Sequence, residues 1–168
     1  MKNKPFNRNF VRFLFILVIG LFVFSLVHAN EPLDIWSYNT DDSCRADQMQ
    51  IRVTVRSIGS GGMLSVGLYD DPKKFLKKKG RKQRIRIPVT EDQHMVCFNI
   101  KQPGTYAVAV YHDVDSNHKL RKRWNMTPDE PFGLSNNPAQ HFGLPKFSDS
   151  AFVADDMGAD IVIHLQHP

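Results

Sequence analysis

Several features that mark common protein classes are scarce in this sequence. It has two cysteines in 168 residues, and neither lies in a CxxC motif or beside a histidine, so redox catalysis and zinc binding are disfavoured. No stretch after residue 29 carries a sustained apolar repeat of 3.6 residues, which argues against a helical fold. The composition, 42% hydrophobic and 23% charged, excludes a disordered tail, a collagen and a polytopic membrane protein.

Acidic residues are absent from the first 29 positions, which contain the cations Lys2, Lys4, Arg8 and Arg12. The formal net charge of +5 therefore depends on this segment, and the rest of the chain has 18 cations against 17 anions. A globally basic nucleic-acid-binding protein is excluded as the simple interpretation.

The first 29 residues have the layout of a secretory signal peptide. A cationic start precedes an apolar run over residues 13–27, and Val27-His28-Ala29 offers a cleavage site after Ala29. The alternative is an uncleaved membrane anchor over residues 13–27, although this run of 15 residues is shorter than the roughly 20 that a bilayer requires. We expect an exported protein, periplasmic or extracellular, without a stable transmembrane span once the signal is removed.

The two cysteines, Cys44 and Cys97, would meet an oxidising compartment after export, where thiols tend to pair. A bridge would close a loop of 54 residues and contribute about 4 kcal/mol in the chain-entropy model. Two separate buried thiols are the alternative, because spacing alone does not show proximity.

The remaining chain is expected to be a polar lead-in over residues 30–48 and one domain over residues 49–168. Apolar residues alternate with polar ones in about seven short segments, most of them separated by turn signals. These segments lie near residues 51–55, 64–68, 85–89, 96–100, 106–110, 151–154 and 161–165. Pro88 cannot donate to a strand ladder and indicates an edge strand. We therefore predict an all-β fold, an antiparallel β-sandwich of about seven strands.

Residues 113–150 form a long segment without a strand pattern, rich in Pro, Gly and Asn. Such a segment within a compact domain is usually functional or disordered. Its aromatic residues Trp124, Phe132, Phe142 and Phe147 favour an ordered loop packed by its own side chains.

Three sequence segments resemble the bacterial family called domain of unknown function 2141. They are PGTYAVAVYHD from Pro103, SNN from Ser135, and Phe142-Gly143-Leu144-Pro145 followed by Phe147. The resemblance spans about residues 51–165 and implies a small secreted β-sandwich of the transthyretin-like or carboxypeptidase-regulatory kind, with no established activity. The chain departs from the family pattern at His118, where members usually have Gly, and at Arg121, where they have Asp.

Asp113, Asp115 and Asn117 have the spacing of oxygen ligands in a calcium loop. Against calcium, His118 and Trp124 occupy the positions where such a loop would have Gly and a bidentate Glu. An Asx-rich turn, in which the carboxylates accept backbone N–H groups, is the favoured interpretation. We expect no cofactor, and calcium remains the alternative.

Other polar residues of this segment suggest weaker hypotheses. His112, His118 and His141 would form a metal site only if they converged, and Ser135 lacks the sequence of a nucleophile elbow. Ser135, Asn136 and Asn137 more readily hold the loop by bonding its backbone. The candidate ligand-binding residues are His112, Asp113, Asp115, Asn117, Ser135, Asn136 and Asn137, and their convergence with Glu130 would favour ligand binding.

Residues 73–86 contain nine cations and no anion, so the rest of the chain after residue 29 has a net charge of −8. The candidate anion-binding residues are Lys73, Lys74, Lys77, Lys78, Lys79, Arg81, Lys82, Arg84 and Arg86. Anionic lipid or acidic polysaccharide would be their partners outside the cytoplasm. A solvated loop is the alternative, and nucleic acid is disfavoured because Phe75 is the segment's one aromatic residue.

The sequence therefore favours a non-catalytic envelope or extracellular binding module for an anionic or polar ligand. The alternative is a metal-binding protein or enzyme that uses His112, Asp113 and Asp115. A third hypothesis, an accessory protein of a larger envelope assembly, predicts co-purification with an envelope protein.

Overall fold

The structure is a computed structural model that describes residues 44–124, 128–139 and 144–168. The expected signal peptide, the alternative anchor, most of the lead-in segment and His141 lie outside the described residues. The strands are β1 (Gln50–Arg56), β2 (Met63–Tyr69), β3 (Gln83–Pro88), β4 (Gln93–Asn99), β5 (Gly104–Asp113), β6 (Phe132–Leu134), β7 (Phe152–Ala154) and β8 (Gly158–His164). The short helices are η2 (Pro72–Lys74), η3 (Lys78–Gly80) and α2 (Phe147–Ser150).

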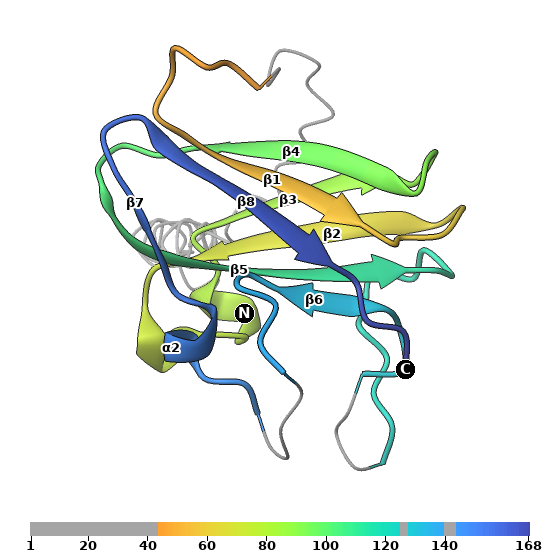
Figure 1. The fold of residues 1–168 in the computed structure, drawn as a ribbon. Coiled ribbons are helices and arrows are strands. Elements are labelled where there is room, and N and C mark those ends of the chain that lie inside the picture. Colours follow the sequence, from red (N-terminus) through yellow and green to blue (C-terminus); the bar gives the residue numbers. More distant parts are fainter. Residues whose placement is uncertain (1–43, 125–127, 140–143) are drawn as a thin grey trace, which may run out of the picture. The chain divides into compact units, whose positions relative to one another are not determined.

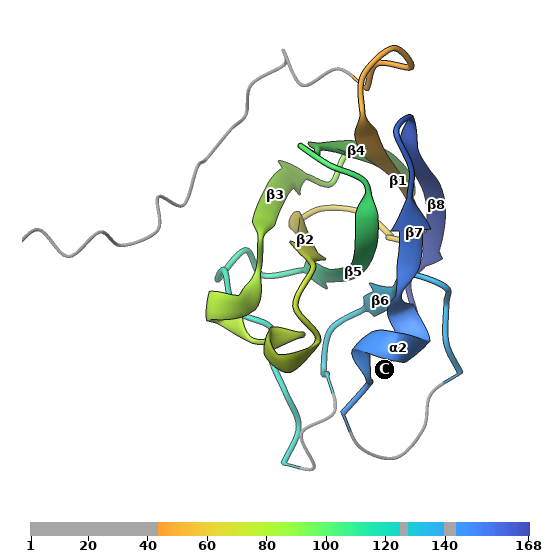
Figure 2. The ribbon, with the colours of Figure 1, turned by 90° about the vertical axis from the view of Figure 1, so that its left-hand side faces the viewer.

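The strands form two sheets, as Figures 1 and 2 show from two directions. One sheet has the order β4-β1-β8, and the other has the order β3-β2-β5-β6 with β7 also paired to β5. The predicted all-β sandwich is confirmed. Pro88 ends β3, which lies at the edge of its sheet as predicted.

Pairing is antiparallel between the other named strands, but β1 and β8 are parallel, with Val53 opposite Ile161. Gly158 begins this pairing in a left-handed conformation, with φ of 92°. A Cβ atom there would lie 1.8 Å from the Gln50 carbonyl oxygen. No residue with a side chain fits this close approach of the two strands.

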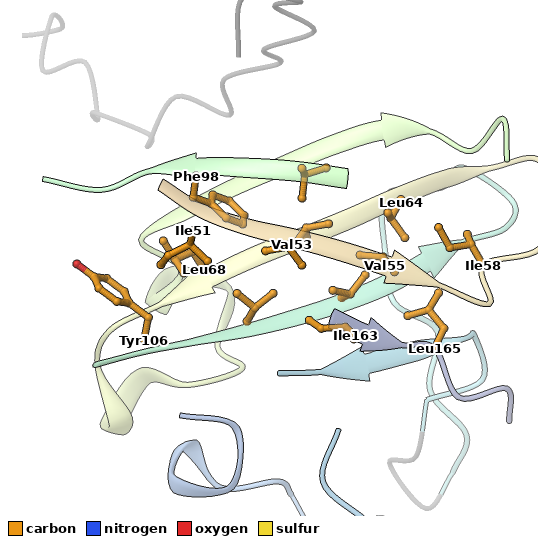
Figure 3. Packing of buried hydrophobic residues seen from close by; sticks show 14 of the residues in the cluster. Ile51, Val53, Val55, Ile58, Leu64, Leu68, Phe98, Tyr106, Ile163 and Leu165 are labelled. Carbon is orange, nitrogen blue, oxygen red and sulfur yellow. The ribbon is translucent and has the colours of Figure 1, made fainter. Parts of the chain in front are cut away.

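The main core fills the space between the sheets (Figure 3). Ile51, Val53 and Val55 of β1 are fully buried, because alternate residues of a strand point to the same face. Leu64 and Leu68 of β2 face them from the other sheet (Figure 3). The same cluster includes Val66, Phe98, Val108 and Ile163. At about 25 cal/mol per Å² of buried apolar surface, this cluster is the main favourable contribution to folding.

A second, smaller cluster lies on the opposite face of the second sheet. The Phe75 ring makes edge-to-face contacts with Tyr69, at 5.2 Å between centroids, and with Phe147, at 5.6 Å. Ala107 and Leu134 complete this cluster. It attaches the segment containing η2 and η3 to α2, beside the second sheet.

The expectation that residues 113–150 lack regular structure needs correction. This segment contains β6, which pairs with Ala109–Tyr111 of β5, and the helix α2. Gly133 of β6 packs so closely that an added Cβ would lie 2.5 Å from Ile163. A strand of three residues is too short to show an alternation of apolar and polar residues, so the sequence pattern cannot distinguish it from a loop.

The predicted disulfide between Cys44 and Cys97 is present, with 5.4 Å between the Cα atoms. It ties the segment before β1 to β4. Among the described residues, no helix has the length and apolar content to cross a bilayer.

Candidate functional site

The last two residues of β5, His112 and Asp113, were predicted to act together but lie apart in the structure. His112 and Asp113 are neighbours on one strand, so their side chains leave on opposite faces of the sheet. His112 is 3% exposed, and its Nε2 lies 2.6 Å from the Gly61 carbonyl oxygen. The structure therefore separates His112 from the carboxylates of Asp113 and Asp115.

The loop after β5 is a series of Asx turns. Asp113 accepts the backbone N–H groups of Asn117, at 3.0 Å, and His118, at 2.7 Å. Asp115 accepts the Asn117 side-chain amide at 2.7 Å, and Asn117 Oδ1 accepts the Lys119 N–H at 2.8 Å. These bonds agree with the favoured turn interpretation. Each of the three candidate calcium ligands, Asp113, Asp115 and Asn117, thus accepts hydrogen bonds within the turn.

Glu130 joins the two aspartates from the other side of the loop. One carboxylate oxygen from each of Asp113, Asp115 and Glu130 lies within 4.8 Å of the others. Glu130 is fully buried, and Asp113 is 1% exposed. Glu130 Oε2 accepts the Arg121 backbone N–H at 3.0 Å. Sequence spacing alone assigns Glu130 no role as a ligand, because its separation from Asp113 along the chain matches no known ligand pattern.

The Asp115 carboxylate is stabilised in its charged form. Desolvation raises the pKa of the Asp115 carboxyl group. Hydrogen bonds with the Asn117 backbone, the Asn117 side chain and the Asp113 side chain lower it, as does the positive charge of Arg121, and the net result is a lowered pKa. The Arg121 guanidinium approaches Asp115 to 3.7 Å. The cluster thus places three carboxyl groups beside one guanidinium at its exposed edge.

Ser135, Asn136 and Asn137 hold the chain after β6. Ser135 is fully buried and accepts the Val108 N–H at 2.9 Å, while its hydroxyl donates to the Ser150 carbonyl oxygen. Asn136 and Asn137 donate to the carbonyl oxygens of Ala151 and Val162, at 2.7 and 2.8 Å respectively. All three side chains therefore bond backbone groups of neighbouring segments, which is the loop-holding role that the sequence favoured.

The cationic surface, defined as the nine cations between Lys73 and Arg86, lies on η2, η3 and the edge strand β3. Two of its lysines form ion pairs, Lys74 with Asp71 and Lys82 with Asp70. The pKa of Lys82 is raised by its hydrogen bond to Asp70. Burial and then the neighbouring Arg86 lower the pKa of Arg84, so positive charges are crowded along β3.

The cationic surface contacts the loop after β5 through Arg86. Its guanidinium lies 3.2 Å from His118 Nδ1 and donates to the His118 carbonyl oxygen at 3.3 Å. The His118 ring therefore contacts β3, so the structure does not support a histidine metal site formed with His112.

An open groove of about 490 Å³ lies at the other end of the cationic surface. Its apolar side chains are Phe75, Leu76, Leu144 and Phe147, and its cationic side chains are Lys73, Lys77 and Lys146. Leu76 has a left-handed φ of 61° and is 36% exposed. A leucine is rare in this conformation because its Cβ crowds the backbone, at a cost of about 1 kcal/mol. The groove thus combines apolar surface, strained backbone and positive charge.

Comparison with known proteins identifies one related group. The sequence model of the family described as "Uncharacterized protein conserved in bacteria", domain of unknown function 2141, matches residues 53–161. The match includes the cationic surface and the three carboxyl groups of Asp113, Asp115 and Glu130. No curated protein and no solved structure matches the chain.

Proposed function

The chain belongs to this bacterial family, domain of unknown function 2141, and we propose that it is an exported, non-catalytic binding module for an anionic lipid. The lipid binds in the groove between η2 and α2, and the cationic surface attracts it. The observation that carries this proposal is the combination of apolar groove residues with lysines at the same groove.

Export is supported by two independent features. Residues 1–29 have the composition of a signal peptide, and Cys44 and Cys97 form a disulfide, which persists in oxidising compartments. Intact-mass measurement of the protein recovered from the periplasm or medium tests this proposal. The expected mass is that of a chain that begins at Asn30, whereas a mass that includes Met1 to Ala29 would favour the uncleaved anchor.

The composition of the groove favours a lipid over a soluble polyanion. The groove has a volume of about 490 Å³ and is open to solvent rather than enclosed. Leu76 and Leu144 are exposed beside it, at 36% and 73%, and a leucine side chain provides neither the charge nor the hydrogen bonds that bind an acidic polysaccharide. An acyl chain would cover them, and a phosphate or carboxylate headgroup would meet Lys73, Lys77 and Lys146.

Long-range charge supports the same ligand. Residues 70–86 contain nine cations against the two anions Asp70 and Asp71. Each lysine near an anionic membrane surface contributes about 1 kcal/mol, and salt screens this contribution. A cationic surface therefore raises the local concentration of anionic lipid at the groove.

The absence of catalysis in this proposal is supported by the positions of the candidate catalytic groups. His112 and Asp113 lie on opposite faces of β5. Ser135 is fully buried and bonds the backbone of Val108. In these positions the three side chains do not form a nucleophile–base pair.

Co-sedimentation of the mature protein with phosphatidylglycerol vesicles, compared with phosphatidylcholine vesicles, tests the function. We expect binding to the anionic vesicles, and roughly 10- to 100-fold weaker binding for a variant with Lys73, Lys77 and Lys146 changed to Gln. The matched control changes the same number of exposed lysines away from the groove, Lys101, Lys119 and Lys122. Equal loss in both variants would reject the groove as the site.

Substitution Leu76→Gly separates binding from folding. Glycine adopts a positive φ without strain, so the melting temperature should stay the same or rise slightly, while vesicle binding weakens. Binding to dextran sulfate together with no binding to vesicles would instead favour an acidic polysaccharide and overturn the lipid proposal.

A further inference from the structure

Asp113, Asp115 and Glu130, termed the carboxylate cluster, bring three carboxyl groups together at the end of β5. Asp113 and Glu130 are buried to within 1% exposure. Arg121 forms an ion pair with the exposed member, Asp115, at 3.7 Å. Buried carboxylates are costly unless they are paired or coordinate a metal.

One atom of the cluster lacks a partner altogether in the described part of the chain. Glu130 Oε1 is buried and makes no hydrogen bond there, although Oε2 of the same group accepts the Arg121 N–H. A buried acceptor without a donor is rare in folded proteins, and each instance needs an explanation. This oxygen belongs to the residue whose carboxylate lies within 4.8 Å of those of Asp113 and Asp115.

We propose that Asp113, Asp115 and Glu130 bind one calcium ion, with the unpartnered Glu130 Oε1 as a ligand. Calcium takes oxygen ligands at about 2.3–2.6 Å, so two ligands on opposite sides of one ion are about 4.6–5.2 Å apart. The mutual separation within 4.8 Å therefore allows all three carboxylates to share one ion. Backbone carbonyl groups and water complete its coordination, as in other calcium sites of high coordination number.

The ligand types select a hard cation. All three groups are carboxylates, and the nearby imidazoles point elsewhere: His112 bonds Gly61 and His118 contacts Arg86. Zinc and copper prefer imidazole or thiolate. Magnesium, at about 2.0–2.1 Å, requires its opposite ligands within about 4.2 Å and usually keeps most of its water.

The proposed site differs from the one that sequence spacing suggested. Asn117 is replaced as the third ligand because Glu130 Oε1 is buried and has no hydrogen-bond partner in the described part of the chain, whereas Asn117 Oδ1 accepts the Lys119 N–H. Glu130 lies 13 positions further along the sequence. The ion would thus join the end of β5 to the chain just before β6, closing the intervening loop at its base.

Isothermal titration of the mature protein with CaCl₂, after treatment with a chelator, tests the proposal without any lipid. We expect one calcium ion per chain, tighter binding of calcium than of magnesium or zinc, and a melting temperature that rises with calcium concentration. No heat and no melting shift at millimolar calcium would overturn the proposal. Preferential binding of zinc or magnesium would also overturn it.

The substitution Glu130→Gln keeps the shape but removes the charge of the buried ligand. We expect at least a tenfold loss of calcium affinity, whereas Asp129→Asn, which changes an exposed neighbour paired with Arg123, should bind as the wild type does. If Glu130→Gln does not fold, Asp115→Asn decides the question, because the Asp115 side chain is 43% exposed. Unchanged affinity in the folded variant contradicts the site. The result leaves the proposed lipid binding untouched, since the titration contains no lipid.

Discussion

Asp160 and Arg52 show how a single polar pair on the surface of the first sheet responds to pH. They lie opposite each other in the parallel pairing of β8 and β1. Arg52 donates twice to the Asp160 carboxylate, at 2.6 and 2.9 Å. This hydrogen bonding lowers the pKa of Asp160 and raises that of Arg52. Because the Asp160 side chain is 75% exposed, solvent screens most of the interaction.

The change Asp160→Asn should lower the free energy of unfolding at pH 7 by about 0.5–1 kcal/mol. A carboxylate with a lowered pKa stabilises the fold above its unfolded pKa, and that contribution is lost as the pH falls through its folded pKa. The difference between variant and wild type should therefore shrink below about pH 4. Urea denaturation at pH 7, 4 and 2.5 measures it, with the exposed Asp156→Asn as control. A difference that persists at low pH would contradict this account.

At the scale of single residues, some side chains that are neighbours in the sequence lie apart in the structure. Alternation along β5 places His112 in the core-facing row and Asp113 on the other face, and this could be read from the sequence pattern. The position of Glu130 could not, because it depends on β6 pairing with Ala109–Tyr111, a contact between segments far apart in the chain. The spacing of Asp113 and Asp115 therefore predicted two members of the carboxylate cluster, and tertiary structure supplies the third.

Among the elements, strands with several alternating residues were predictable and short or unusual ones were not. Burying one face of a strand imposes alternation, so β1, β2 and β5 have clear sequence patterns. The strand β6, with three residues, is too short for a pattern. Alternation also carries no information on strand direction, which is why the parallel pairing of β1 with β8 was not anticipated.

The disulfide between Cys44 and Cys97 acts on the element that precedes β1. Changing both cysteines to Ser should lower the free energy of unfolding by about 2–4 kcal/mol, because the unfolded chain regains the freedom of a 54-residue loop. Urea denaturation of the variant, with the reduced wild type as a control, measures this loss. Equal midpoints for the oxidised wild type and the variant would show that the bridge adds no stability.

Over the whole molecule, charge is segregated rather than scarce. After residue 29 the chain has 18 cations and 17 anions, yet nine of the cations lie between Lys73 and Arg86. A protein with this distribution presents a strong local positive potential in spite of a net charge near zero.

Ion-exchange chromatography of the mature protein at pH 7 tests this segregation. We expect retention on a cation exchanger, and earlier elution when Lys77, Lys78 and Lys79 are changed to Gln. The control variant with Lys101, Lys119 and Lys122 changed to Gln has the same net charge but keeps the cationic surface. Elution of both variants at the same salt concentration would mean that net charge alone governs retention.

The parallel pairing of β1 with β8 has a consequence for the order of events in the cell. A ribosome makes β1 first among the strands and β8 last, and Ile163 of β8 supplies a fully buried side chain to the shared core. A nascent chain that lacks its final strand leaves that position of the core open to water. The two sheets are therefore expected to complete their shared core only after the ribosome has released β8.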